Sequence, residues 1–263
     1  MRALWTGSIS FGLINIPVRL YSGSDSRDGI DLRMLHKKDL SPIRYSRVCR
    51  KDGKEIPYDQ IVKGYEYQDG DYITLEEADF KKADAEKTTA IEISLFADAR
   101  EIDIRYYDKP YYLEPAKGAE KPYALLREAL AKSGKVAVAR FVMRGREHLA
   151  AITPVERALV LEQMRFTDEL RRPTGLKLPT GGHVAASEIE LAMKLVKQLS
   201  GAFIPEDYHD TYTEELEEII EEKAKGHKPK PHGKAPTITK SHDLMATLKA
   251  SLDSHPATKT KRN

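Results

Sequence analysis

The stretch PYALLREALAKSGKVAVARFVMRGREHLAAITP, residues 122–154, decides the fold class of this chain. Its first part places leucine and alanine on one face at helical spacing, which predicts a short helix over residues 123–131. The dipeptide Ser133-Gly134 follows, and glycine readily adopts the left-handed conformation that ends a helix. The stretch therefore begins with a helix that stops at a defined residue.

The rest of the stretch predicts a β-hairpin. Residues 135–143 carry apolar side chains on both faces, which is typical of an interior strand. Arg144-Gly145 predicts a tight turn, and residues 146–153 return as a second strand. A helix followed by an interior hairpin indicates an α+β fold.

The hairpin carries more positive charge than a core hairpin needs. Arg140 interrupts an otherwise apolar face, and Arg144, Arg146 and His148 crowd around the turn. One interpretation is an ordinary solvated turn, where basic residues are common. The other is a hairpin that offers guanidinium groups to a polyanion, since arginine pairs well with phosphate. The residue pattern alone leaves both interpretations open.

The segment closely resembles the Ku family of bacterial non-homologous end joining, whose members bind DNA ends. YALLREAL, GKVAVARFVMR and REHLAAI occur there in the same order. The resemblance covers residues 1 to 225, and several further blocks carry it. They are LWTGSISFGLINIPVRLY at 4–21, LH and DLSPIRY with RVC and DGKEI within 35–56, IVKGYEY at 61–67, YYDKPYYLEP at 106–115 and IPEDYHDTYTEEL at 204–216.

The resemblance implies an α+β fold: a Ku-core β-barrel with an arch over the DNA and a helical arm, two chains closing into a ring. We expect the core at residues 1–205, with the arch at about 30–64 and the arm helix at about 187–200. Residues 206–226 predict an acidic helix, and 227–263 a Lys/Pro-rich tail with too little apolar surface to fold alone. Within that tail, residues 243–251 predict a short amphipathic segment that folds on a partner.

The implied function is sequence-independent binding of double-stranded DNA ends by a homodimer. The resemblance also implies protection and bridging of breaks, and recruitment and stimulation of a multifunctional ATP-dependent DNA ligase, ligase D. For the arch, the alternative is a solvated surface of mixed charge, because acidic residues are interleaved there. The expected DNA-binding residues are Arg33, Lys37, Arg44, Arg47, Arg50, Lys51, Lys54, Lys63, Arg140, Arg144, Arg146, Lys228, Lys230, Lys234, Lys259, Lys261 and Arg262.

The charge distribution agrees with a polyanion partner better than the net charge does. The 263 residues carry a formal charge of only +2, but residues 227–263 carry +6 and the remainder −4. The one cysteine, Cys49, excludes an intrachain disulfide and a multi-cysteine zinc site. Many family members have a second cysteine in a C..CG motif, where this chain has Asp52, so we expect no zinc and no other cofactor.

We find no catalytic set in the sequence. No glycine-rich loop is followed by Lys-Ser/Thr, and no histidine or carboxylate has a spacing that requires metal binding. We therefore expect a binding protein rather than an enzyme; a nuclease and a pure protein scaffold are the alternatives. No run of about 18 apolar residues and no secretory h-region are present, so we expect a cytoplasmic, nucleoid-associated protein without a membrane partner.

Four further predictions concern the secondary structure of single segments. Pro17 predicts an edge or bulged strand, because it lacks a ladder donor. Residues 102–107 predict a strand by alternation. Residues 153–156 form a capping-box pattern that favours a helix, whereas the resemblance favours a strand over Leu159–Phe166, which we adopt. A second capping box, Ser187 with Glu190, predicts where the arm helix begins.

Overall fold

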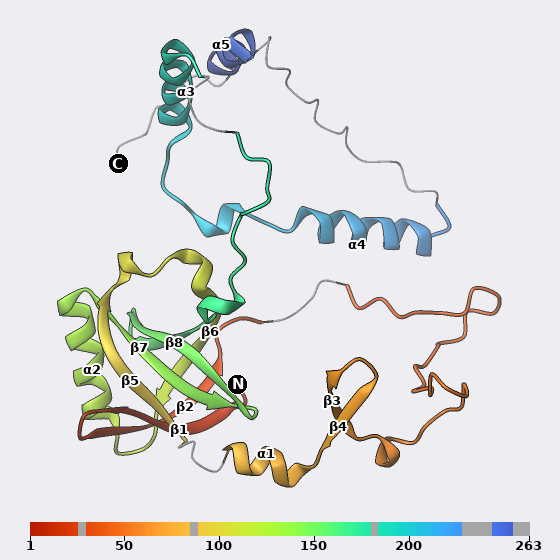
Figure 1. The fold of residues 1–263 in the computed structure, drawn as a ribbon. Helices are drawn as coiled ribbons and strands as arrows, with labels where there is room; N and C mark the ends of the chain where they lie inside the picture. Colours follow the sequence, from red (N-terminus) through yellow and green to blue (C-terminus); the bar gives the residue numbers. More distant parts are fainter. Residues whose placement is uncertain (26–29, 85–88, 180–183, 228–243, 255–263) are drawn as a thin grey trace. The chain divides into compact units, whose positions relative to one another are not determined.

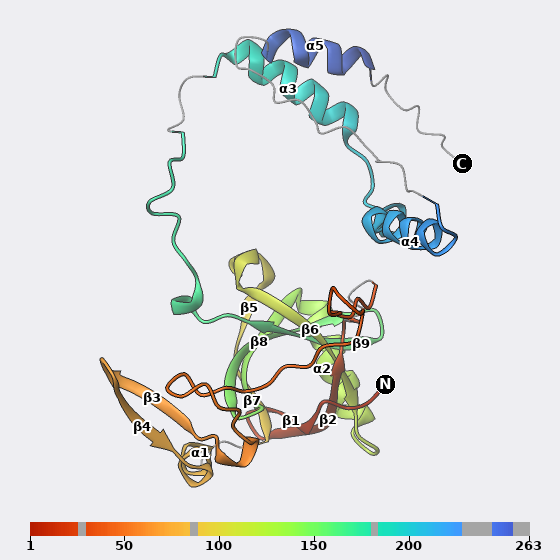
Figure 2. The same ribbon diagram turned by 90° about the vertical axis from the view of Figure 1, so that its right-hand side faces the viewer.

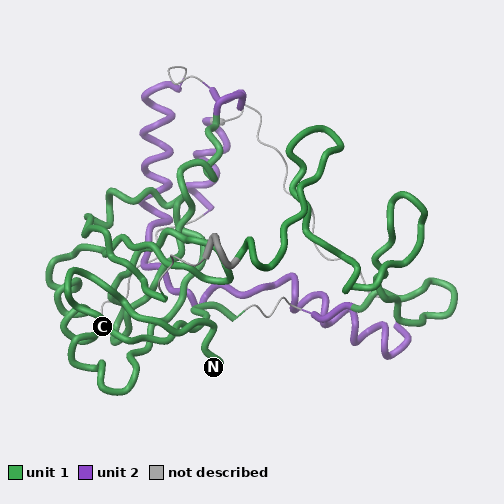
Figure 3. The backbone as a smooth tube through the Cα atoms, turned by 60° about the horizontal axis from the view of Figure 1, so that its bottom comes forward, with its two compact units in different colours: residues 1–27, 33–173 green, residues 28–32, 174–263 purple. Residues whose placement is uncertain are grey.

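The computed structural model describes residues 1–25, 30–84, 89–179, 184–227 and 244–254 (Figure 1). The chain divides into two compact units (Figure 3). Residues 1–27 and 33–173 form the first, and residues 28–32 and 174–263 form the second. The first unit holds all the described strands, and the second holds three α-helices.

The centre of the first unit is a closed β-barrel (Figures 1 and 2). Its strands follow the order β1-β2-β6-β9-β8-β7-β5, and a parallel pairing of β1 with β5 closes the circle. The strands are β1 Trp5–Phe11, β2 Ile14–Ser22, β5 Ala90–Asp98, β6 Tyr107–Pro115, β7 Lys135–Met143, β8 Arg146–Val155 and β9 Ala158–Met164. The predicted α+β class and Ku-type barrel are confirmed.

Side chains fill the barrel interior, as in other small barrels. Small residues on β7 and β8, including Ala139 and Ala150, are fully buried and leave room for Phe141. The ring of Phe141 meets Trp5 edge-on, with ring centroids 6.3 Å apart. The alternation along β7 places Ala139 and Phe141 inward, so the predicted interior strand over 135–143 is confirmed.

Helix α2, Glu120–Ser133, completes this core. It is longer than the predicted 123–131, and it ends as predicted at Gly134, which has a φ of 66°. The hydroxyl of Tyr123 donates to the carbonyl of Leu113 at 2.6 Å and accepts from the N–H of Leu159 at 2.7 Å. One buried side chain therefore ties α2 to two strands.

The prediction for Pro17 is wrong, because β2 is an interior strand of the closed barrel. The last register pair between β2 and β6 is Val18 with Pro115, so Pro17 lies just beyond that ladder. Its carbonyl still accepts the N–H of Ala116 at 2.9 Å on this side. Pro17 therefore lies at the end of the β2–β6 ladder, and the β1–β2 register runs past it without a bulge.

The prediction of a strand over residues 102–107 is also wrong. Two 3-10 turns, η2 Ala99–Glu101 just before this segment and η3 Ile104–Tyr106 within it, are found instead, and β6 begins at Tyr107. Asp98 and Asp103 cap these turns, since their carboxylates accept the N–H groups of Arg100 and Arg105. Local capping by aspartate outweighs the alternating pattern here.

The sequence carries opposing signals after residue 153, a helix start at 153–156 and a strand at 159–166, and the structure shows the strand. Strand β8 runs to Val155, a turn with Glu156 at φ 50° follows, and β9 occupies 158–164. Three residues of the capping-box pattern, 153–155, thus lie in β8 and pair with β9, and this tertiary pairing overrides the local helix signal.

Residues 33–84 contain little regular structure. The elements are η1 Tyr58–Gln60, the hairpin of β3 Lys63–Gln68 and β4 Asp71–Leu75, and α1 Glu77–Asp84. The turn of the hairpin contains Gly70 at φ 85°. Every residue of β3 and β4 is exposed, and the two strands pair only with each other among the described strands.

The second unit contains α3 Ala186–Leu199, η5 Pro205–Asp207, α4 Thr211–Ala224 and α5 Leu244–Ser254. The predicted capping box of Ser187 is wrong: α3 begins one residue earlier, and the carboxylate of Glu188 accepts the N–H of Ala185 at 2.9 Å. Within the predicted tail, α5 is a helix that packs along α3 (Figure 2), where the Gln198 side chain donates to the Leu252 carbonyl at 3.2 Å.

Among the described residues, we find no helix with the length and apolar character that a membrane crossing requires. The predicted boundaries of core, acidic helix and tail stay predictions.

Candidate nucleic-acid interface

A first group of predicted DNA-binding cations lies on a tight loop closed by a bridge between Val48 and Glu55. Gly53 takes a φ of 72° near its tip, which lets the chain reverse direction. Arg50 and Lys51 lie on this loop with exposed side chains. Neither makes an ion pair with a described residue. The loop therefore presents two uncompensated cations to solvent.

Two further cations of this segment lie against aromatic rings. The guanidinium carbon of Arg47 lies 5.0 Å from the ring centre of Tyr58. The Lys63 ammonium lies 4.7 Å from the ring centre of Phe80. Cation–π contacts of this kind restrict a long side chain while leaving its charge exposed.

Arg33, Lys37 and Arg44 lie around a second isolated bridge, between Leu35 and Pro42. All three are exposed, and none has a carboxylate partner among the described residues. With Arg47, Arg50, Lys51 and Lys63, seven of the eight predicted cations in residues 33–63 are thus without a counter-ion among the described residues, and only Lys54 has one.

Three acidic residues in this segment, Asp39, Asp52 and Glu55, have local partners. The Asp39 carboxylate accepts the hydroxyl of Ser41 at 2.7 Å and its N–H at 3.1 Å, and these bonds lower the pKa of Asp39. Asp52 accepts the N–H of Lys54 at 3.2 Å and lies 3.8 Å from its ammonium. The Asp39 and Asp52 carboxylates are both engaged by neighbouring residues of their own turns. They are therefore less available to neutralise the remaining cations, which favours an anion-binding surface over a surface of mixed charge.

The β7–β8 hairpin separates the three arginines predicted there. Arg144 and Gly145 both have positive φ, 54° and 72°, and form the turn. Arg146 is the register partner of Met143, which points inward, whereas Arg140 is exposed on the alternate face of β7. Arg144 lies in the turn and Arg146 directly after it, and Arg140 faces away from Arg146.

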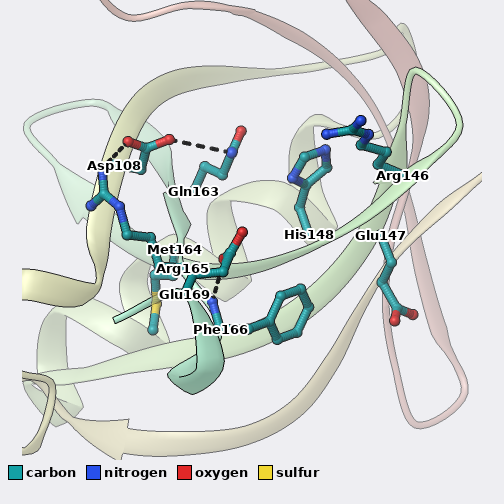
Figure 4. Close-up of a pocket in the computed structure, with 9 residues that line it drawn as sticks. All are labelled: Asp108, Arg146, Glu147, His148, Gln163, Met164, Arg165, Phe166 and Glu169. Atoms are coloured by element: carbon teal, nitrogen blue, oxygen red, sulfur yellow. Dashed lines mark hydrogen bonds and ion pairs between the residues drawn. The ribbon is translucent and has the colours of Figure 1, made fainter. Parts of the chain in front are cut away.

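A pocket of about 300 Å³ lies beside this turn (Figure 4). Arg146 and His148 point toward one another at one side, and the His148 ring lies 5.4 Å from that of Phe141. Burial raises the pKa of the nearby Tyr111 hydroxyl, and the positive charge of Arg144 opposes that shift. The pocket is lined by Asp108, Arg146, Glu147, His148, Gln163, Met164, Arg165, Phe166 and Glu169.

Sequence reasoning missed Arg165, which holds the other side of the pocket. Its guanidinium donates to the carbonyl of Tyr107 at 2.5 Å and to that of Arg105 at 3.3 Å, and it pairs with the Asp108 carboxylate. Arg165 therefore fixes the end of β9 to the start of β6. No periodicity signals this role, because it depends on two strands that meet only in the folded barrel.

The predicted tail contacts Lys228, Lys230, Lys234, Lys259, Lys261 and Arg262 lie outside the described residues. Within the described ranges, no group of three His, Cys, Asp or Glu side chains could hold a metal ion. Cys49 is a free thiol of intermediate exposure. The described site offers exposed point charges, which suit contact with a repeating phosphate backbone.

Comparison with known proteins gives one consistent result. A model of the Ku70/Ku80 beta-barrel domain matches residues 10–193. Three similar proteins carry the name "Non-homologous end joining protein Ku". The protein from Opitutus terrae is 43% identical over 260 residues, 96% of this chain and 92% of that protein. The protein from Archaeoglobus fulgidus is 42% identical over 229 residues (86% and 89%), and that from Coxiella burnetii is 38% identical over 265 (98% and 96%).

Proposed function

The chain belongs to the Ku family, and we propose that it binds the ends of double-stranded DNA, without regard to sequence, in non-homologous end joining. The pathway comes from the names of its relatives. The mode of binding comes from the chain's own charge pattern.

The observation that carries this proposal is the set of exposed cations in residues 33–63 without carboxylate partners. Lysine and arginine contacts to phosphate position a protein on a duplex but carry no sequence information. Each contact releases counter-ions from the DNA, so affinity falls steeply with salt concentration. A segment of this kind suits a protein that must accept any broken end.

Specificity for ends requires a second element, which we propose is topological. Two copies of the chain close into a ring through which the duplex passes. A closed ring loads only where a duplex terminates, and it then slides inward because successive phosphates are nearly equivalent. The barrel suits the role of ring scaffold, since its strands leave no free edge and its interior is filled.

The β7–β8 arginines divide into two sets under this proposal. Arg144 in the turn and Arg146 directly after it can meet neighbouring phosphates together. Arg140 lies on the alternate face, so it contacts DNA independently of Arg146 or not at all. Single substitutions to glutamate separate these cases, because only true contacts reduce the salt dependence of binding.

We propose that the basic C-terminal segment adds phosphate contacts at high local concentration. Removing the whole segment would also remove α5 and uncover α3. A cleaner variant changes Lys228, Lys230 and Lys234 to alanine and keeps α5. The salt slope of DNA binding should fall by up to about 0.9 per lost contact; an unchanged slope would assign these lysines another role.

The protein then serves as a platform for a multifunctional ATP-dependent DNA ligase at the chromosome, and performs no bond chemistry itself. Helix α4 supports such a contact, because six exposed glutamates cover it: Glu214, Glu215, Glu217, Glu218, Glu221 and Glu222. A surface of one sign steers a partner of the opposite charge.

Equilibrium competition tests the proposed function. Labelled linear duplex is bound to the protein and challenged with unlabelled linear DNA or with a covalently closed circle of the same sequence. We expect the linear competitor to displace the label and the circle to be a poor competitor at 0.15 M salt, roughly physiological. Equal competition by both forms would refute end binding, and cleavage of either form with magnesium or manganese would favour a nuclease.

A further inference from the structure

An apolar groove lies on the first unit, apart from the cations described above. Its volume is about 440 Å³, within the usual range for ligand pockets of roughly 300–1,000 Å³. Helix α2 supplies one wall, with Leu125 and Ala129. Ile14 of β2 lies on the opposite side, and Phe11 and Phe96 meet edge-on with ring centroids 6.3 Å apart.

The groove leaves large apolar side chains exposed to water. Leu125 is 62% exposed, Phe96 43% and Ile14 39%. Beneath them, Leu126 and Leu130 are buried in the barrel core, so the floor is fixed. A contiguous apolar surface on a rigid floor is the usual mark of a protein-binding site. DNA is a poor occupant, because apolar walls cannot replace the hydration of phosphate.

The lining of the groove favours an occupant that docks through its side chains. Strand β5 pairs with β7 over Glu92–Asp98, and its pairing with β1 covers only Ala90–Glu92. The apolar lining is made of side chains from α2, β1, β2 and β5, so we expect a partner to dock mainly through side chains. An amphipathic helix does this, because residues at i, i+4 and i+7 project from one face into a groove.

The rim of the groove determines the charge of that helix. Lys135 lines the groove, and Lys121 and Lys132 lie on α2 one and two turns from Leu125. None of the three forms an ion pair with a described residue. Two acids lie beside these lysines: Glu128 is paired with Arg127 at 2.7 Å, and Asp98, the register partner of Lys135, accepts the N–H of Arg100. The apolar groove thus has a basic rim.

We propose that this groove binds an amphipathic α-helix of a partner protein, with apolar residues on one face and acidic residues on its flanks. The inference goes beyond DNA-end binding, since the groove uses none of the predicted DNA contacts. It gives the barrel a protein-docking surface that works whether or not DNA is bound.

Two labelled synthetic peptides test the proposal in the absence of DNA. Both are helical, with leucines at i, i+4 and i+7; one has glutamates on its flanks and the other has lysines. By fluorescence anisotropy with the full chain, we expect the glutamate peptide to bind about tenfold more tightly, given three lysines on the rim. No saturable binding, or equal binding of the two peptides, would overturn the proposal.

Leu125→Glu places a charge in the groove and should weaken peptide binding at least about tenfold. Ile104→Glu is the matched control, because Ile104 is 82% exposed and lies on η3 away from the groove. Unchanged binding by Leu125→Glu would overturn the proposal. So would conversion of the chain to a monomer by this variant alone, since a second copy would then be the occupant.

A charge exchange distinguishes docking from general damage to the fold. Lys132→Glu with Lys135→Glu should reverse the preference, so that the lysine peptide binds more tightly, while Lys109→Glu on β6 should leave it unchanged. A destabilised protein cannot produce such a reversal. Retained DNA-end binding by these variants would show that the groove and the DNA contacts are separate, and loss of the peptide preference without reversal would contradict the proposed rim.

Discussion

The barrel and residues 33–84 are built on opposite principles. In the barrel every strand is paired on both sides, and inward side chains such as Ile152 and Leu161 are fully buried. In residues 33–80 the only described hairpin pairs with itself, and nearly every side chain is exposed. A lone two-stranded hairpin is marginally stable in water. The barrel therefore supplies the stability, and the exposed segment supplies charge.

The largest expected difference between the two regions concerns aromatic side chains. Phe141→Ala removes a fully buried ring from the barrel core, so we expect it to lower the free energy of unfolding by about 3–5 kcal/mol. Tyr65→Ala on the exposed β3 should change it by less than about 0.5 kcal/mol. Urea denaturation of both variants measures this. Similar losses would mean that the exposed segment shares the stability of the barrel.

The next effect concerns one buried hydroxyl. Tyr123→Phe leaves the Leu113 carbonyl and the Leu159 N–H without their partner, so we expect a loss of about 1–3 kcal/mol. Tyr72→Phe, on the exposed hairpin, is the control and should be neutral. Thermal and urea unfolding give both values; a neutral Tyr123→Phe would show that another group satisfies this pair.

In the third prediction the larger effect belongs to the exposed segment, because the substitutions change DNA binding and not stability. Arg50→Glu with Lys51→Glu should leave the free energy of unfolding unchanged within about 0.5 kcal/mol. If both side chains contact phosphate, the slope of log K against log salt should become shallower by about 1.8. Lys109→Glu on the barrel is the control outside this loop, with half the change in charge. An unchanged slope in the double variant would remove this loop from the interface.

The smallest effect concerns the orientation of one cation. Tyr58→Ala removes the ring beneath Arg47, and Tyr58→Phe keeps it. A cation–π contact at an exposed site contributes about 0.5–1 kcal/mol, so we expect the alanine variant to bind linear duplex about two- to fivefold more weakly. The phenylalanine variant should bind as the unchanged chain does. Equal weakening in both would assign the effect to the hydroxyl.

Sequence patterns predicted the barrel hairpin because its signals are local and agree with one another. Gly134 and the turn at Arg144-Gly145 both adopt the positive φ that their residues favour or tolerate. The failures occur where a distant partner decides. Pro17 is tolerated because the β2–β6 ladder ends beside it, and the helix signal at 153–156 is overridden by the pairing of β8 with β9.

The site was predictable in charge but not in arrangement. Exposed cations such as Arg50 follow from composition, whereas their lack of counter-ions depends on Asp39 and Asp52 being occupied by local turns. The separation of Arg140 from Arg146 follows from register, which sequence spacing across a turn leaves undetermined. Nothing in the sequence distinguishes Arg165 from other arginines, because its partners Asp108 and Tyr107 come close to it only in the folded barrel.

One trapping experiment tests the central claim most directly. The protein is loaded on a linear duplex, the duplex is then ligated into a circle, and the complex is washed with about 1 M salt, where phosphate contacts are largely screened. A ring should stay threaded on the closed circle and be released when a restriction enzyme reopens it. Release from the closed circle as fast as from linear DNA would contradict the account, because no ring would then encircle the duplex.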